Sequence, residues 1–235
     1  KSFESSTEIF HALHDILRNK GYSTSVGFEG AFAPREIKSN EEAFELITEA
    51  IEKANHKQEF EIALDVASSE FFSNGKYILK RNNKELTTNE WINTQKEWYS
   101  KYPVFSVEDP IEQEDWDGWT KFRKETNNIY QVVGDDLLTT NVKRIEEGIQ
   151  KGCMNAVLIK INQIGTISET LDAIRMTVDN NMTAIISHRS GETNDDLIAD
   201  LAVGTPATQC KFGGPDRGER LVKYNRMIEI ERRKK

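Results

Sequence analysis

Short, continuously apolar runs alternate with helical stretches along most of the 235 residues. A run such as Ala156–Ile159 contains no polar residue, which is typical of a strand that is covered on both faces of its sheet. Chains in which such strands alternate with helices form parallel sheets, because each helix returns the chain to the same end of the sheet. The sequence therefore predicts an α/β fold, with either a barrel or a doubly wound sheet.

The boundaries of these elements can be predicted from apolar runs and from capping residues. Six strands are expected, at Glu59–Ala67, Val104–Val107, Tyr130–Gly134, Ala156–Ile161, Thr183–Ser187 and Thr208–Phe212. Helices are expected before Gly21, from Asn141 to Gly152, from Ser168 to about Asn180, and from Asn194 to Gly204. Ser73–Asn89 is expected to form a long loop or a small hairpin. No Pro/Gly/Ser-rich linker divides the chain, so we predict one domain over residues 1–235.

Charge and composition exclude several classes of partner. The chain has 31 Lys and Arg against 39 Asp and Glu, a net charge of −8, so no global positive field attracts a nucleic acid. No apolar stretch approaches the length of a transmembrane segment. The two cysteines have no metal-binding spacing and suit a reducing compartment. We therefore expect a cytoplasmic protein with no nucleic-acid partner and no transmembrane segment.

An ionisable residue stands at the end of every predicted strand. These residues are Asp65, Glu108, Asp135, Lys160, His188 and Lys211. In a (β/α) barrel the carboxyl ends of the strands meet at one mouth, where the active sites of that fold are built. The six side chains are therefore expected to converge.

Three of these strand-end residues are carboxylates from consecutive strands. Without a cation, Asp65, Glu108 and Asp135 would repel one another in a shared site. A divalent ion removes that conflict, and ligation by oxygen alone favours Mg²⁺ over Zn²⁺. Taken singly, each acid has the alternative interpretation of a helix cap or a loop hydrogen bond.

The remaining strand-end residues suggest proton transfer and anion binding. Lys160 and Lys211 directly follow apolar strand residues, and a nearby cation lowers the pKa of an ammonium group in general, so either is a candidate base. Solvated lysines are the alternative interpretation. His188, Arg189 and Ser190 precede a predicted helix, a combination suited to a phosphate.

Five motifs resemble those of the enolase family, the phosphopyruvate hydratases of glycolysis. They are Leu64–Phe71, Ser106–Pro110, Gly134–Leu137, Leu158–Thr166 and Ser187–Thr193. The resemblance runs from about Phe3 to about Ile230. It implies the C-terminal TIM-like (β/α) barrel domain, incomplete and with about six βα units, because family members carry a capping domain and two more barrel strands before the position of Lys1.

The resemblance also implies a role for each site residue. The Mg²⁺ ligands would be Asp65, Glu108 and Asp135. Lys160 would take the proton from carbon 2 of 2-phosphoglycerate, and Glu29 would assist departure of the 3-hydroxyl to give phosphoenolpyruvate. The substrate would be held by His188, Arg189, Ser190 and Lys211, with the phosphate on Arg189 and Ser190 and the carboxylate on Lys211. A homodimer of the full-length protein is implied as well.

Two departures from the family pattern lead to other expectations. Phe28 and Ala31 stand where the family motif around Glu29 has an aspartate and a glycine. With the capping domain absent too, we expect these 235 residues alone to turn over 2-phosphoglycerate far more slowly than a complete enolase. One alternative is a catalytically silent binding protein, displayed on the cell surface and recognising plasminogen through Lys234 and Lys235. Another is a superfamily member that acts on a different carboxylate.

Overall fold

The computed structural model describes residues 2–233 of the chain. These residues form two compact units, each of which is described by itself. The first unit contains the chain up to Phe60, His188–Val203 and the chain from Lys211 onward. The second contains Glu61–Ser187 and Gly204–Cys210. Since each unit combines separate stretches of chain, no linker in the sequence marks them, and the single domain remains a prediction.

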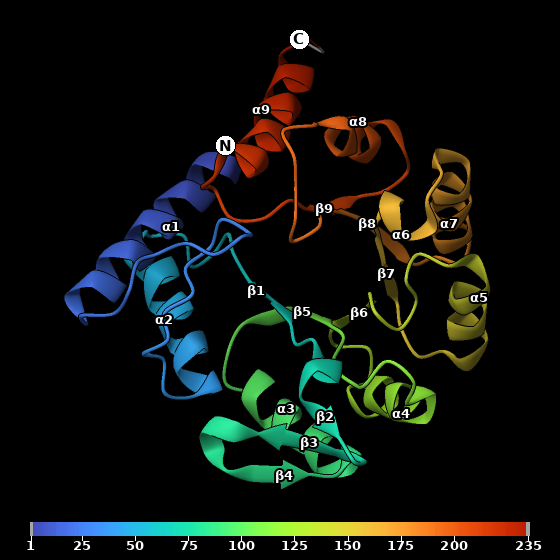
Figure 1. The fold of residues 1–235 in the computed structure, drawn as a ribbon, viewed down its shortest axis with the longest axis horizontal. Helices are drawn as coiled ribbons and strands as arrows, with labels where there is room; N and C mark the ends of the chain where they lie inside the picture. The colour runs from blue at the N-terminus through green and yellow to red at the C-terminus, as the bar shows by residue number, and fades with distance from the viewer. Residues whose placement is uncertain (1, 234–235) are drawn as a thin grey trace. The chain divides into compact units, whose positions relative to one another are not determined.

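A six-stranded sheet dominates the second unit (Figure 1). Its strands, in spatial order, are β1 (Ile62–Asp65), β5 (Val104–Glu108), β6 (Gln131–Gly134), β7 (Ala156–Ile159), β8 (Thr183–Ser187) and β9 (Gln209–Lys211). Neighbours from β1 to β8 pair in parallel. In the described residues β1 and β9 are the two edges and do not pair, so the sheet is an incomplete barrel. The predicted parallel α/β fold is confirmed.

Burial of the sheet explains why its strands are continuous apolar runs in the sequence. All four residues of β7 are buried, as are all four of β6. Val133, Ala156, Leu158 and Ile185 form one apolar cluster across β6, β7 and β8. The polar residues that follow the strands therefore mark the points where the chain leaves this core.

Helices follow the strands, and their caps decide where they begin. The second unit contains α3 (Thr88–Tyr99), α4 (Trp116–Glu125), α5 (Val142–Lys151), α6 (Ile161–Ile164) and α7 (Ile167–Asp179). Asn141 caps α5 by accepting hydrogen bonds from the next turn, and Gly152 ends it in a left-handed conformation, as predicted. The predicted start of α7 at Ser168 was wrong, because Thr166 accepts from the Glu169 N–H and begins the helix earlier.

The segment predicted as a long loop or a hairpin forms a small antiparallel sheet. Its strands are β2 (Phe72–Ser73), β3 (Lys76–Leu79) and β4 (Lys84–Leu86), with short 3₁₀ turns at Ser68–Phe71 and Lys80–Asn82. Tyr77 and Trp91 are buried beside it, with ring centroids 5.7 Å apart. This aromatic contact supplies the packing that a two-stranded hairpin alone would lack.

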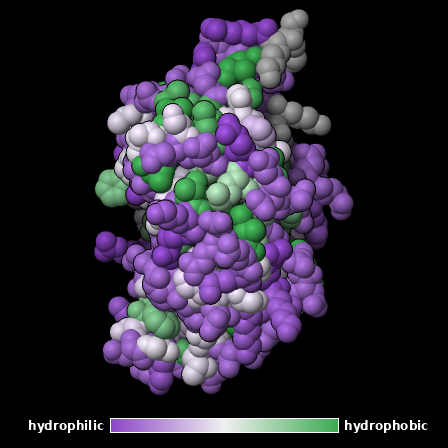
Figure 2. All heavy atoms as spheres, turned by 90° about the vertical axis from the view of Figure 1, so that its right-hand side faces the viewer, coloured by the Kyte–Doolittle hydropathy of each residue, from purple (hydrophilic) through white to green (hydrophobic). Residues whose placement is uncertain are grey.

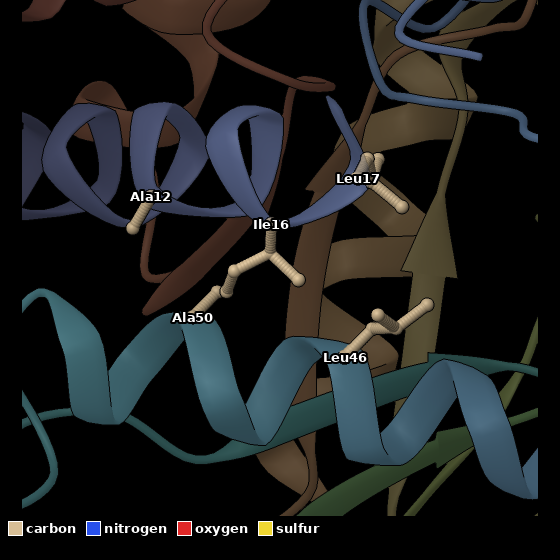
Figure 3. Packing of buried hydrophobic residues seen from close by; sticks show 5 residues of the cluster. All are labelled: Ala12, Ile16, Leu17, Leu46 and Ala50. Carbon is tan, nitrogen blue, oxygen red and sulfur yellow. The ribbon is translucent and has the colours of Figure 1, made fainter. Parts of the chain in front are cut away.

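The first unit is built on helices α1 (Ser2–Asn19), α2 (Asn40–Lys53), α8 (Leu197–Gly204) and α9 (Gly218–Arg233). Figure 3 shows the buried faces of α1 and α2 against each other, with Ala12, Ile16 and Leu17 opposite Leu46 and Ala50. The predicted start of α8 at Asn194 was also wrong, because the helix begins at Leu197, whose N–H donates to the Asp195 side chain.

Among residues 2–233, no helix is long and apolar enough to cross a membrane. On the face drawn in Figure 2, hydrophilic residues predominate and hydrophobic ones lie in small, separate groups.

Candidate active site

Strands β1 and β5 place two of the predicted metal ligands side by side. Asp65 is paired with Glu108 in the register of the parallel sheet, and the Val66 N–H donates to the Glu108 carbonyl at 2.9 Å. Glu108 is 5% exposed, whereas Asp65 is exposed. The sheet register thus places the Cα atoms that carry these two carboxylates side by side.

The next two strands bring the third carboxylate to the predicted base. Asp135 follows β6 and Lys160 follows β7, and the Lys160 Nζ donates to the Asp135 Oδ2 at 2.5 Å. The Lys160 side chain is 14% exposed and that of Asp135 is 8% exposed. The buried Thr140 hydroxyl accepts from the Lys160 backbone N–H at 2.9 Å and so fixes the chain at the base of this lysine.

Sequence reasoning missed Asp109, whose side chain holds the backbone of Asp135. Its carboxyl oxygens accept from the backbone N–H groups of Asp135, at 3.0 Å, and Asp136, at 2.8 Å. Burial raises the pKa of the Asp109 carboxyl to about 8, against the lowering effect of these two N–H donors. Burial and the charge of Asp135 also raise the pKa of Asp136. The signal available in the sequence was that Asp109 directly follows the predicted ligand Glu108.

The oxygen donors fit a hard divalent cation. Among residues 2–233, Asp109, Asp135 and Asp136 form a group of three in which one oxygen of each carboxyl lies within 4.8 Å of the others. Asp109 already accepts from two backbone N–H groups, so it is better suited to orienting Asp135 than to ligation. Asp65 and Glu108 lie outside this cluster, and their place as ligands remains a prediction. Carboxylate oxygens without His or Cys suit Mg²⁺ rather than Zn²⁺.

In the first unit, a tight turn presents Glu29. The Gly27 N–H donates to the Ala31 carbonyl at 2.8 Å, and Gly30 has a positive φ of 72°, which a glycine adopts at little cost. The Gly214 N–H donates to the Glu29 carbonyl at 2.7 Å. Phe28, on the same turn, is 75% exposed, and the Arg217 guanidinium lies 5.9 Å from its ring.

The Glu29 carboxylate meets two of the predicted substrate residues. The Ser190 hydroxyl donates to the Glu29 Oε1 at 2.5 Å, and the His188 Nε2 lies 3.7 Å from the Oε2. The backbone N–H of His188 donates to the Lys211 carbonyl at 2.9 Å, so Lys211 lies next to the same segment. The structure therefore brings Glu29, His188 and Ser190 together although the first lies far from the others in sequence.

Two buried cations on α9 hold this arrangement, and sequence reasoning missed both. Arg220 and Lys223 are fully buried. Arg220 bonds to the His188 ring and to three backbone carbonyls. The Lys223 Nζ donates to the Glu192 Oε2 at 2.9 Å and to the carbonyls of Thr193 and Glu219. The sequence shows only that Arg220 and Lys223 lie about one helical turn apart, on the same face of α9. A basic helix face is usually solvated, so this spacing did not indicate burial.

These contacts set the electrostatics of His188. The pKa of its imidazole is lowered to about 4, mainly by burial; Glu29 and Glu192 oppose this shift, and the charges of Arg220 and Lys211 contribute to it. The ring is therefore neutral near pH 7. Burial opposes the ionisation of Glu192, but its bonds to Lys223 and to the Arg189 N–H leave the pKa of this carboxyl lowered. Glu192 is thus a fixed anion that links α9 to the loop.

The predicted site residues fall into two sets, one in each unit. The strand-end group, in the second unit, contains Asp65, Glu108, Asp135 and Lys160. The loop group, in the first unit, contains Glu29, His188, Arg189, Ser190 and Lys211. The first set offers carboxylates and an amine, and the second offers a carboxylate, a neutral imidazole, a hydroxyl and two cations.

A comparison with protein-family models agrees with the fold. The model described as "Enolase, C-terminal TIM barrel domain" matches residues 1–234, which is almost the whole chain.

Proposed function

The chain belongs to the family of the enolase C-terminal TIM-barrel domain, and on that premise we propose that it carries the chemistry of a hydro-lyase. The reaction is the reversible, Mg²⁺-dependent dehydration of 2-phosphoglycerate to phosphoenolpyruvate. The observation that carries this proposal is the contact of the Lys160 Nζ with the Asp135 Oδ2 at 2.5 Å. This contact places the candidate base, Lys160, beside a candidate metal ligand, Asp135. That arrangement suits the removal of a proton from the carbon next to a carboxylate.

The difficulty of the reaction is the charge that develops on the substrate. Removing the carbon-2 proton places a second negative charge on a carboxylate that already carries one. Enolase-superfamily sites are already known to answer this with a lysine or histidine base and one or two Mg²⁺ ions, so this pairing is family knowledge rather than our finding. Bound Mg²⁺, held by Asp65, Glu108 and Asp135, would supply the compensating positive charge.

The residues of this chain then divide the proton transfers. Lys160 accepts the carbon-2 proton, and the electron pair of that C–H bond passes into the substrate carboxylate. When the pair returns to form the double bond, the 3-hydroxyl leaves and takes a proton from Glu29, so that water is released. Arg189 and Ser190 hold the phosphate, and Lys211 holds the substrate carboxylate.

Exchange of the carbon-2 proton with deuterium tests this proposal, because exchange needs only the first step and remains measurable when turnover is slow. The assay follows 2-phosphoglycerate by NMR with Mg²⁺ present. Lys160→Ala should lower the exchange rate by about 10²- to 10⁴-fold, the usual contribution of a positioned base. Lys143→Ala, at an exposed position on α5, is the matched control and should leave the rate unchanged. Equal rates in both variants would remove Lys160 from this role.

The same assay distinguishes the other functions. Glycerate, which lacks the phosphate, should exchange far more slowly; equal exchange would indicate a superfamily enzyme that acts on a different carboxylate. No exchange at all in the parent chain would favour a catalytically silent binding protein. The plasminogen alternative depends on Lys234 and Lys235, which lie outside the described residues, and no observation on residues 2–233 favours it.

A further inference from the structure

We propose that Arg220 is a positioning residue that fixes the tautomer and ring orientation of His188, so that the His188 Nε2–H faces the Glu29 carboxylate. The catalytic meaning of this arrangement rests on the proposed function, but its geometry does not. All the residues involved belong to the first unit.

The chemistry of the guanidinium decides where the imidazole proton lies. The Arg220 Nη1 is 2.6 Å from the His188 Nδ1. A guanidinium only donates hydrogen bonds, so the Nδ1 must be the acceptor and carry no proton. The proton of the neutral ring is then on the Nε2, which is the nitrogen that lies 3.7 Å from the Glu29 Oε2.

The same guanidinium holds the backbone before Glu29 and the backbone after His188. Its Nη1 also donates to the Arg189 carbonyl at 2.8 Å, and its Nη2 donates to the carbonyls of Phe28 and Ser190, each at 2.7 Å. Arg220 thus bridges the residue before Glu29 and the residues after His188. The planar fork is needed for this, since one ammonium cannot direct separate pairs of donors at both segments.

The buried surroundings leave His188 little freedom to turn. Gly213 packs against the ring, where a Cβ atom would lie 3.0 Å from the His188 Cε1 and 2.8 Å from the Arg220 Cδ. The Arg220 Nε is buried without a hydrogen-bond partner, so its four Nη bonds are what retain the charge in the interior. The charged groups that act on His188 are Glu29, Arg220, Lys211 and Glu192.

The consequence concerns the acid that the proposed function assigns to Glu29. The Ser190 hydroxyl donates to the Oε1 and the Nε2–H is directed toward the Oε2, so both carboxylate oxygens face donors. In the other tautomer an Nε2 lone pair would face the carboxylate and repel it. Arg220 therefore determines, through His188, which ring nitrogen faces the Glu29 carboxylate, without touching substrate.

The test is ¹⁵N NMR of the imidazole in the 235-residue chain, which distinguishes protonated from unprotonated ring nitrogens. Near neutral pH the parent chain should show the Nε2–H tautomer alone. Arg220→Met should give a mixture of tautomers, and the imidazole pKa should rise by at least about one unit toward its ordinary value of 6.5, because the donor and its positive charge are both removed. Arg226→Met, on the same helix but in a partly exposed ion pair with Asp200, should change neither.

An Nδ1–H tautomer in the parent chain would overturn the proposal, and this result needs no variant to fold. An unchanged tautomer in folded Arg220→Met would overturn it as well. Because the measurement requires no turnover, absence of carbon-2 exchange would overturn the proposed function alone and leave this assignment in place.

Discussion

The strand-end group and the loop group are positioned by different physical means. In the strand-end group the residues follow parallel strands, and hydrogen bonds between backbones place Asp65 beside Glu108. In the loop group a backbone hydrogen bond joins His188 to Lys211, at the end of β9. The side chains of Arg220 and Lys223 hold the other segments of this group. One group depends on sheet register, and the other depends on two buried cations.

This difference predicts unequal tolerance of mutation. A parallel ladder has many backbone bonds, so the loss of one side chain changes its register little. A buried cation with several acceptors leaves all of them unpaired when it is removed, and that costs more than an ordinary hydrogen bond. The loop group should therefore be the more easily broken of the two.

The largest effect is expected from Lys223→Met. This change leaves the Glu192 carboxylate and two carbonyls without their buried donor, and it should lower the free energy of unfolding by about 3–5 kcal/mol. Arg226→Met, which breaks a more exposed pair on the same helix, should cost less than about 1 kcal/mol. Urea denaturation measures both. Similar losses would show that burial of the cation is not what stabilises the loop.

The pH dependence of stability should come next. Unfolded His188 binds a proton below its ordinary pKa of 6.5, whereas the folded chain binds it only near pH 4. The unfolded state therefore binds more protons in this window, and stability contributed by His188 is lost as the pH falls from 6.5 to 4, by roughly 3 kcal/mol. The difference between the parent chain and His188→Gln, measured by urea denaturation across this range, isolates the effect. Parallel curves would contradict it.

A smaller effect is expected in the strand-end group from Asp109→Asn. The amide keeps one acceptor oxygen and turns an NH₂ group toward a backbone N–H of Asp135 or Asp136, so the loss should be about 1–3 kcal/mol. Asp117→Asn, at an exposed position on α4, should stay within about 0.5 kcal/mol of the parent. Mg²⁺ titration calorimetry should show weaker binding in Asp109→Asn only. If Asp109→Asn lowered the free energy of unfolding as much as Lys223→Met, the two groups would not differ in their tolerance of mutation.

The smallest effect is expected at a helix cap between two site strands. Asn141→Ala removes the acceptor for the first turn of α5 and should cost about 1 kcal/mol. Since β6 and β7 pair directly, Mg²⁺ affinity should not change. A weakened Mg²⁺ affinity would mean that the cap of α5 also helps to position Asp135 and Lys160.

The sequence by itself determined the strand-end group and the frame that carries it. Apolar runs predicted the six strands to within a few residues, and the acid or base after each run marked Asp65, Glu108, Asp135 and Lys160. This works because burial on both sheet faces and the start of a loop are local properties of the chain. The caps at Asn141 and Gly152 were equally visible, whereas the starts of α7 and α8 were not, since neighbouring residues competed for the cap.

The tertiary structure alone decided how the loop group is held. Nothing in the sequence around Arg220 or Lys223 distinguishes a buried cation from a solvated one, because the acceptors that make burial tolerable lie on distant segments at Phe28, His188–Ser190 and Glu192–Thr193. The support of Asp135 by Asp109 likewise depends on two strands coming together. A charge can be buried only where the fold brings enough partners to it, and that condition is met in space rather than along the chain.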